Sequence, residues 1–154
     1  MAKLSVGSKA PAFSLVAGNG KKYSLKDFSG KKVVLYFYPK DDTSGCTAEA
    51  CSFRDNLSAI KKKGAVVIGV SPDAPSKHEK FTSKYDLNFP LLSDESKKML
   101  TKYDVWQEKS MYGRKYMGVV RTTLIIDEQG KITHIFPKVK VDGHTEEILK
   151  AIGE

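Results

Sequence analysis

The sequence contains only two cysteines, and no apolar run approaches the roughly 18 residues that a membrane-spanning helix needs. Its first residues, Met1-Ala2-Lys3-Leu4, lack the apolar stretch of a signal peptide. We therefore predict a cytoplasmic protein without a membrane partner, in which Cys46 and Cys51 rest as thiols. The chain also has no repeat, low-complexity segment or linker, so its 154 residues predict a single domain over 1–154.

Metal and nucleic-acid sites are poorly supported by the composition. A zinc site usually needs four ligands, and His78, His134 and His144 have no ligand-like spacing to the cysteines. We expect no metal, no other cofactor, and histidines that lie at the surface. The net charge of +8 is compatible with an anionic partner. However, the lysines are scattered in pairs without interleaved aromatic residues, which favours a soluble basic surface over nucleic-acid binding.

The hydrophobic pattern predicts an α/β fold with a mixed central sheet flanked by helices. We expect strands at 13–16, 22–25, 32–38, 65–70, 89–92, 119–126 and 131–136, and helices at 47–63, 76–87, 97–105 and 142–152. The first two strands flank Gly18-Asn19-Gly20 and predict an N-terminal β-hairpin. The early β-α-β alternation predicts a parallel core, and the last two strands predict an antiparallel side. Residues 104–118 are predicted to be irregular.

The segment from Pro39 to Cys51 carries the chemistry, because it lies where a buried strand ends and a helix begins. In open α/β sheets, ligands favour the carboxyl ends of the strands. A helix N-terminus lowers the pKa of cysteines from about 8.5 into a range of roughly 3.5 to 7.5, and the thiolate is the reactive form. Lower basicity also weakens a nucleophile. Fast chemistry at Cys46 would therefore need further donors around the reacting atoms.

The spacing between the two cysteines sets a geometric condition. Five positions along an ideal helix advance about 7.5 Å, which puts the two Cα atoms about 8.7 Å apart. Disulfides rarely exceed a Cα separation of about 6.8 Å. If Cys46 and Cys51 form a bond, the first turns of the helix must unwind. The alternative is that they are two small buried residues that never pair.

At these residues the sequence resembles the peroxiredoxins. The motif P-x-x-x-[T/S]-x-x-C stands here as Pro39, Thr43 and Cys46. The bacterioferritin-comigratory-protein branch, also called peroxiredoxin Q, is the closer match. Its resemblance covers nearly the whole chain and is carried by 37–41, 45–47, 49–55, 103–106, 112–114 and 118–127. Ser44 departs from the proline of many members, and we expect it to make the approach to Cys46 slightly more flexible.

The resemblance implies a thioredoxin-like fold and a thiol peroxidase acting on hydrogen peroxide and organic hydroperoxides. In such an enzyme, Cys46 becomes a sulfenic acid and Cys51 condenses with it to an intramolecular disulfide. Thioredoxin or a similar dithiol would then reduce the disulfide. The branch contains monomers and dimers, so the resemblance is compatible with a monomer or a weak homodimer.

The resemblance also implies roles for four other residues. Thr43 would hydrogen-bond the thiolate and the substrate, and Pro39 would shield the sulfur from water. Arg121 would pair with the thiolate and the peroxide, and Glu49 would orient that arginine. Without the resemblance, Arg121 could be an edge arginine whose head reaches water, and Thr43 could be a helix cap.

Two further alternatives remain open at this point. A dithiol oxidoreductase or redox sensor would usually carry C-x-x-C, so the C-x4-C spacing counts against that function. Trp106, Met111 and Tyr112 could line an apolar rim that admits alkyl hydroperoxides or contacts a partner. They could equally be ordinary packing beneath a long loop.

Overall fold

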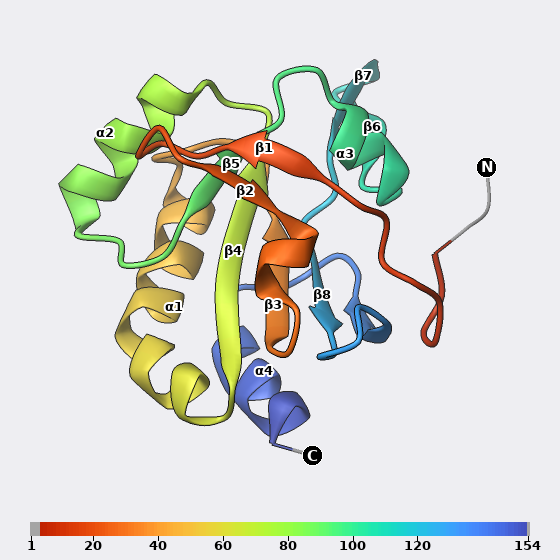
Figure 1. Cartoon of the computed structure of the whole chain (residues 1–154). Coiled ribbons are helices and arrows are strands. Elements are labelled where there is room, and N and C mark those ends of the chain that lie inside the picture. Colours follow the sequence, from red (N-terminus) through yellow and green to blue (C-terminus); the bar gives the residue numbers. More distant parts are fainter. Residues whose placement is uncertain (1–3, 154) are drawn as a thin grey trace.

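The centre of the molecule is a five-stranded mixed sheet with the strand order β5-β4-β3-β8-β9, seen in a computed structural model that describes residues 4–153 (Figure 1). The strands are β3 (Lys32–Phe37), β4 (Ala65–Ser71), β5 (Leu91–Ser93), β8 (Thr122–Ile126) and β9 (Ile132–Phe136). Strands β3, β4 and β5 are parallel, whereas β8 runs antiparallel to β3 and β9 antiparallel to β8. The predicted mixed sheet, with a parallel core and an antiparallel side, is confirmed.

Strand β3 is buried on both faces because its residues alternate between two apolar clusters. Val34 and Tyr36, with Tyr38 just beyond the strand, pack in the cluster that contains helix α1 (Ser44–Lys62). Val33, Leu35 and Phe37 pack in the cluster on the other face. The end of β3 is therefore fixed from both sides, and this rigid end supports the loop that leads to Cys46.

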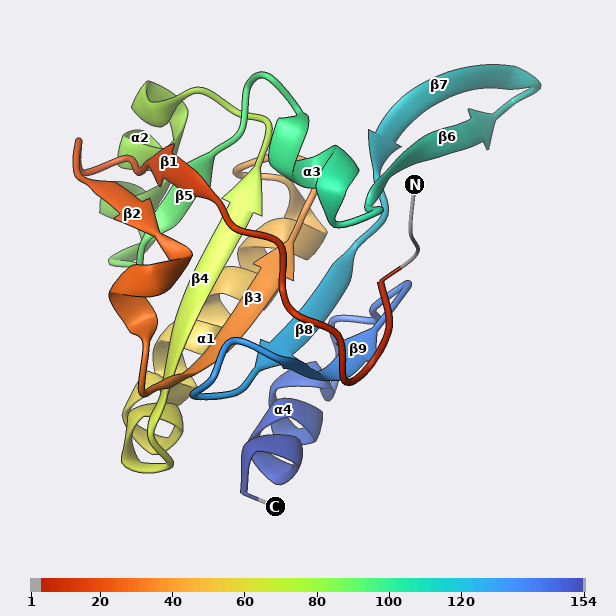
Figure 2. The same cartoon turned by 45° about the vertical axis from the view of Figure 1, so that its right-hand side comes forward.

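Helices and short elements cover both faces of the sheet (Figure 2). One face carries α1, α4 (His144–Ile152) and, through Phe81, α2 (Pro75–Tyr85). On the other face lie α3 (Lys98–Lys102), the 3-10 helix η1 (Leu25–Phe28) and the N-terminal hairpin of β1 (Ser14–Val16) and β2 (Lys22–Ser24). The hairpin was predicted, whereas η1 was not.

The helix boundaries differ from the prediction. Helix α1 begins at Ser44, three residues before the predicted start, although Ser44 and Gly45 are weak helix formers. Helix α3 covers only Lys98–Lys102 of the predicted 97–105. The carboxylate of Asp94 accepts a hydrogen bond from the Leu100 amide at 2.8 Å and thereby fixes this short turn. The N-cap of α4 is Gly143, so the helix itself begins at His144 instead of the predicted residue 142.

The prediction of an irregular segment at 104–118 was wrong. Strands β6 (Trp106–Met111) and β7 (Arg114–Val119) form an antiparallel ribbon that projects away from the sheet in Figure 2. Tyr112 and Gly113 both have positive φ, of 52° and 77°, as a two-residue hairpin turn of type I′ requires. Most of the ribbon is exposed on both faces, so its sequence lacks the alternation of a half-buried strand.

The same ribbon changes the expected positions of several residues. Arg121 was expected inside a strand over 119–126, but it lies between β7 and β8. Trp106 is partly buried against the core and lies under Lys97, whose Nζ is 5.9 Å from the ring centroid. Met111 and Tyr112 are exposed at the ribbon tip, so ordinary packing describes Trp106 and not these two residues.

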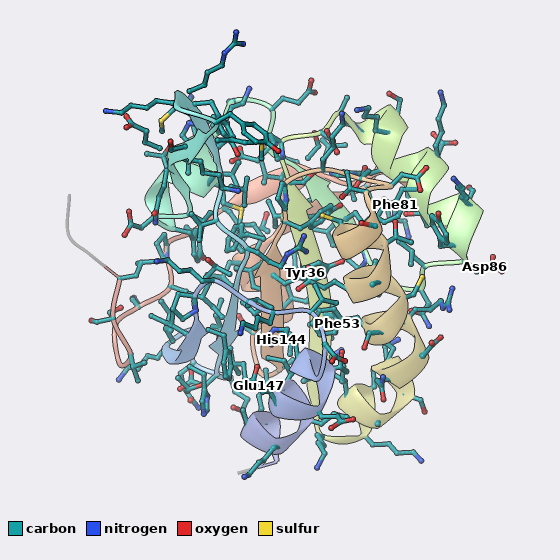
Figure 3. All side chains as sticks on the ribbon, turned by 180° about the vertical axis from the view of Figure 1, so that it is seen from behind. Tyr36, Phe53, Phe81, Asp86, His144 and Glu147 are labelled. Carbon is teal, nitrogen blue, oxygen red and sulfur yellow. The ribbon has the colours of Figure 1, made fainter. Side chains whose placement is uncertain are left out.

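Two of the three histidines are buried, contrary to the expectation that they lie at the surface. His78 has no exposed surface, and His144 is 2% exposed. Figure 3 shows His144 near Phe53, and the two rings meet edge to face with centroids 6.2 Å apart. Because both histidines are packed inside the fold, they need hydrogen-bond partners there. Across residues 4–153, none of the helices combines the length and the apolar composition needed to cross a membrane.

Candidate active site

Cys46 is the third residue of α1, and a short loop connects this helix to the end of β3. Thr43 is the N-cap residue, with extended backbone, and its carbonyl accepts the first helical hydrogen bond, from the Thr47 amide at 2.8 Å. The Cys46 side chain is 1% exposed. The sulfur is thus held in the first turn of a long helix, where backbone N–H groups have no intrahelical partners and the helix dipole is positive.

Arg121 connects this sulfur to a carboxylate on the same helix. Its Nη2 donates to Cys46 Sγ at 3.2 Å, and its Nη1 donates to Glu49 Oε1 at 2.5 Å. Cys46 and Glu49 are three positions apart and therefore lie on one face of α1. The Arg121 side chain is 17% exposed, so a polar, partly solvated group borders the buried sulfur. The structure brings these three predicted residues together from segments 72 and 75 residues apart.

The backbone around Arg121 is fixed by two other segments of the chain. The Val120 amide donates to the Val105 carbonyl at 2.8 Å, and the Val139 amide donates to the Arg121 carbonyl at 2.9 Å. Gly45 lets the helix approach the guanidinium closely, because a Cβ added there would lie 3.3 Å from Nη2. A side chain at this position would therefore displace the guanidinium by a few tenths of an ångström.

Burial dominates the electrostatics of the Glu49 carboxyl. The side chain is 2% exposed, and burial raises its pKa to about 7, although the Arg121 guanidinium acts in the opposite direction. Among the described residues, Oε1 has Arg121 as its partner, whereas Oε2 has no hydrogen-bond partner. Half of the carboxylate is therefore unsolvated and unpaired, which explains why one close ion pair does not offset the cost of burial.

Arg121 and Tyr36 respond to the same cluster of charges. Burial lowers the pKa of Arg121, but the negative charges of Glu49 and Cys46 outweigh burial and raise it, so the guanidinium stays charged. Tyr36 lies between the sheet and α1 in Figure 3, and its hydroxyl is buried without a partner among residues 4–153. Burial and then Glu49 and Cys46 raise the pKa of this phenol, which keeps it neutral.

Lys109, on β6, is a residue near the site that the sequence did not reveal. Burial and then the Arg121 charge lower the pKa of its ammonium group, whereas Cys46 acts to raise it. Its stem runs over Gly118, where an added Cβ would lie 3.2 Å from the lysine Cδ. A second cation thus interacts electrostatically with the sulfur and with Arg121. Nothing in the sequence distinguished Lys109 from the many surface lysines, because its segment was predicted to be irregular.

The remaining predicted residues have other immediate contacts. Thr43 is exposed, and its hydroxyl donates to the Lys40 carbonyl at 2.9 Å; among the described residues, the hydrogen-bond partner of the Cys46 sulfur is Arg121. Pro39 is half-buried directly before the loop. Cys51 is half-buried in the intact helix α1, and both cysteines are free thiols. Residues 4–153 contain no group of three or more His, Cys, Asp or Glu residues arranged to hold a metal ion.

Comparisons with known proteins agree with this geometry. Residues 6–135 match the model of the AhpC/TSA family. The chain is 51% identical over 146 residues to a putative peroxiredoxin Bcp of Coxiella burnetii, covering 95% of this chain and 97% of that protein.

Solved structures give the same result. The crystal structure of a PrxQ mutant from Xylella fastidiosa matches with a TM-score of 0.93 and 32% identity, over 99% of this chain and 97% of that one. The bacterioferritin comigratory protein of Xanthomonas campestris, described for its alkyl peroxide reduction activity, matches with a TM-score of 0.87 and 36% identity, over 91% and 89%. These matches confirm the thioredoxin-like fold. The chain therefore belongs to the AhpC/TSA family, in the Bcp/PrxQ branch of peroxiredoxins, which are thiol peroxidases.

Proposed function

We propose that this protein reduces hydrogen peroxide and organic hydroperoxides at Cys46. The thiolate attacks the terminal peroxide oxygen, the O–O bond breaks, and the leaving oxygen departs as water or an alcohol after taking up a proton. The sulfur is oxidised to a sulfenic acid and the peroxide is reduced. The observation that carries this proposal is the 3.2 Å contact between Arg121 Nη2 and Cys46 Sγ at the start of α1.

The contact supports the chemistry in two ways. A guanidinium is a permanent cation with several N–H donors in a fixed plane, so it can pair with the thiolate and with peroxide oxygen together. Charge moves from sulfur to the leaving oxygen as the O–O bond breaks, and fixed donors in a poorly solvated site stabilise such charge strongly. Glu49 holds Nη1 at 2.5 Å and in this scheme orients the guanidinium.

Thr43 and Pro39 complete the proposed site at the loop. The Thr43 hydroxyl, which donates to the Lys40 carbonyl, would rotate about its side-chain torsion to bond the thiolate and the incoming peroxide. Pro39 has no backbone N–H and would limit water near the sulfur. The alkyl peroxide reduction named for the Xanthomonas campestris relative supports organic hydroperoxides as substrates.

Cys51 would close the cycle. Its thiol attacks the sulfenic sulfur, a disulfide forms, and water leaves. Both cysteines belong to the continuous helix α1, so the first turns of α1 must unwind before the sulfurs meet. Thioredoxin or a similar dithiol would then reduce the disulfide and be oxidised in turn. We propose that this cycle runs in the cytoplasm, in one domain that is a monomer or a weak homodimer.

Thiol titration with mass spectrometry tests the cycle. One equivalent of hydrogen peroxide should remove both thiols of the reduced protein and lower its mass by two hydrogens. Cys46→Ser should abolish peroxide turnover. Cys51→Ser should react once and then stop or overoxidise to sulfinic acid. Turnover that survives Cys46→Ser would refute the proposal, and oxidation of Cys46 without loss of the Cys51 thiol would refute the intramolecular disulfide.

A further inference from the structure

A buried polar network lies beside the loop between β3 and α1. Tyr38 is 1% exposed, Asp41 is 7% exposed, and His78 has no exposed surface. The Tyr38 hydroxyl donates to Asp41 Oδ1 at 2.5 Å, and Asp41 Oδ2 lies 2.5 Å from His78 Nδ1. His78 Nε2 lies 3.0 Å from the Leu92 carbonyl oxygen. We call Tyr38, Asp41 and His78 the loop clasp.

Hydrogen-bond chemistry determines how many protons the loop clasp carries. A carbonyl oxygen only accepts, so His78 Nε2 must carry the hydrogen that faces Leu92. The short contact between Nδ1 and Oδ2 also needs one proton between the two atoms. The Asp41–His78 pair is therefore neutral overall, whichever atom holds that proton, and each of its polar atoms has a partner. Such a saturated buried network is rigid, and removing one member leaves the others unpaired.

The loop clasp fixes a short stretch of chain between two rigid elements. Tyr38 follows β3, His78 belongs to α2, and Asp41 lies three residues before the start of α1. The Asp41 amide also donates to Asp73 Oδ2 at 2.6 Å. The carbonyl of Asp73 in turn accepts the Ser93 hydroxyl at 2.5 Å. Asp41 is thus held through its side chain and its backbone by segments that do not belong to α1.

We infer that Tyr38, Asp41 and His78 are positioning residues that hold the start of α1 in the form that reacts with peroxide and oppose the unwinding that disulfide formation needs. This inference rests on the proposed function. The loop from Pro39 to Thr43 leads directly into the turn that carries Cys46. The loop clasp holds this loop and therefore determines where that turn begins. Weakening the loop clasp should have opposite effects on the two chemical steps. Oxidation of Cys46 should become slower, and formation of the disulfide with Cys51 should become faster.

Asp41→Asn is the test, because it keeps the side-chain volume and removes the carboxylate. Asp42→Asn is the matched control: Asp42 also lies in the loop and contacts α2, through Lys84 at 2.9 Å, but at the surface. Asparagine can still accept from Tyr38 and donate to His78 Nδ1, but its neutral hydrogen bonds are about half as strong as the charge-assisted bonds of a carboxylate, a loss that shifts a local equilibrium about tenfold. Stopped-flow kinetics on the reduced protein should therefore show Cys46 oxidation about tenfold slower and disulfide formation several-fold faster in Asp41→Asn. Both rates should stay within about twofold in Asp42→Asn.

Amide hydrogen exchange gives a readout that does not depend on peroxide. In Asp41→Asn, exchange at residues 47–50, the first amides with helical hydrogen bonds, should become about tenfold faster relative to exchange in β3 and β4, which reports global unfolding. The inference is overturned if both chemical steps slow together, if exchange at 47–50 changes only in proportion to the core, or if Asp42→Asn has the same effect. Should wild-type Cys46 not react with peroxide, the proposed function fails, and the exchange ratio still decides whether the loop clasp holds the start of α1.

Tyr38→Phe provides a milder variant in case Asp41→Asn fails to fold. It removes one hydroxyl at a site that is 1% exposed and leaves the ring in place. The same opposite changes in the two rates, with smaller amplitude, are expected. A Tyr38→Phe protein with both rates unchanged and no added exchange at 47–50 would contradict a role for the hydroxyl in the loop clasp.

Discussion

Replacing Glu49 with glutamine should change how the stability of the protein depends on pH. Burial raises the pKa of the Glu49 carboxyl to about 7 from an ordinary value of 4.5. Below pH 4.5 the carboxyl is protonated in the folded and unfolded states, and the full stability is present. As the pH rises toward and through 7, the unfolded chain releases the proton more readily than the folded one, so stability is lost. The difference in pKa corresponds to about 3 kcal/mol in the free energy of unfolding.

Urea denaturation of the reduced proteins at pH 5 and pH 8 measures this effect. Glutamine does not titrate, so the wild type should lose about 2.5 kcal/mol relative to Glu49→Gln between these two pH values. The comparison cancels the other titrating groups that the two proteins share. Glu108→Gln is the control, because the Glu108 side chain is 61% exposed. Its curve should run parallel to that of the wild type. If the Glu49→Gln curve is also parallel, the buried carboxyl does not control the pH dependence and the argument is refuted.

Three further predictions concern single substitutions. Arg121→Lys keeps the charge and loses the two-pronged donor, so stopped-flow oxidation of the thiol should slow by about 10²- to 10³-fold; a change below about threefold would contradict its role. Lys109→Gln should slow the same step by roughly two- to tenfold, with a loss that shrinks as salt screens the charge; a salt-independent loss would rule out an electrostatic effect. Gly69→Ala should lower stability in urea by about 1–3 kcal/mol, because its Cβ would lie 2.8 Å from Leu91 Cδ2. At Gly118 an added Cβ would lie 3.2 Å from the flexible Lys109 stem and 3.4 Å from the Tyr116 ring, so Gly118→Ala should cost less. Equal costs would show that crowding does not decide the effect.

The central sheet could be predicted because burial leaves a strong pattern in the sequence. After Lys32, the residues of β3 from Val33 to Phe37 form an unbroken buried apolar run, as a strand covered on both faces must. The ribbon of β6 and β7 could not be predicted in this way. Most of its side chains face solvent on both sides, and backbone hydrogen bonds hold its two strands together. Its sequence therefore has no alternation of apolar and polar residues. Gly113 suits the turn, but it had no patterned strands beside it that would predict a hairpin.

The candidate site shows the same division. Local motifs predicted Cys46, Glu49 and Arg121 as site residues. Their contacts form because the fold places Arg121, directly before β8, beside the start of α1. Lys109 and His78 were missed because their importance depends on contacts between distant segments. A buried histidine and a surface histidine look alike in a sequence, and only packing shows that His78 has acceptors at both ring nitrogens. Sequence motifs therefore locate the reacting atoms better than they locate the groups that hold them.

Two backbone hydrogen bonds hold Val120 and Arg121 in place independently of the tip of the projecting ribbon. Only Val120 and Arg121 lie between the projecting ribbon and β8, yet both are tied to other parts of the chain, at Val105 and Val139. We therefore expect bending of the ribbon tip beyond Lys109 to leave the position of the guanidinium unchanged. The tip can therefore change in length and composition while the cation keeps its distance from the sulfur.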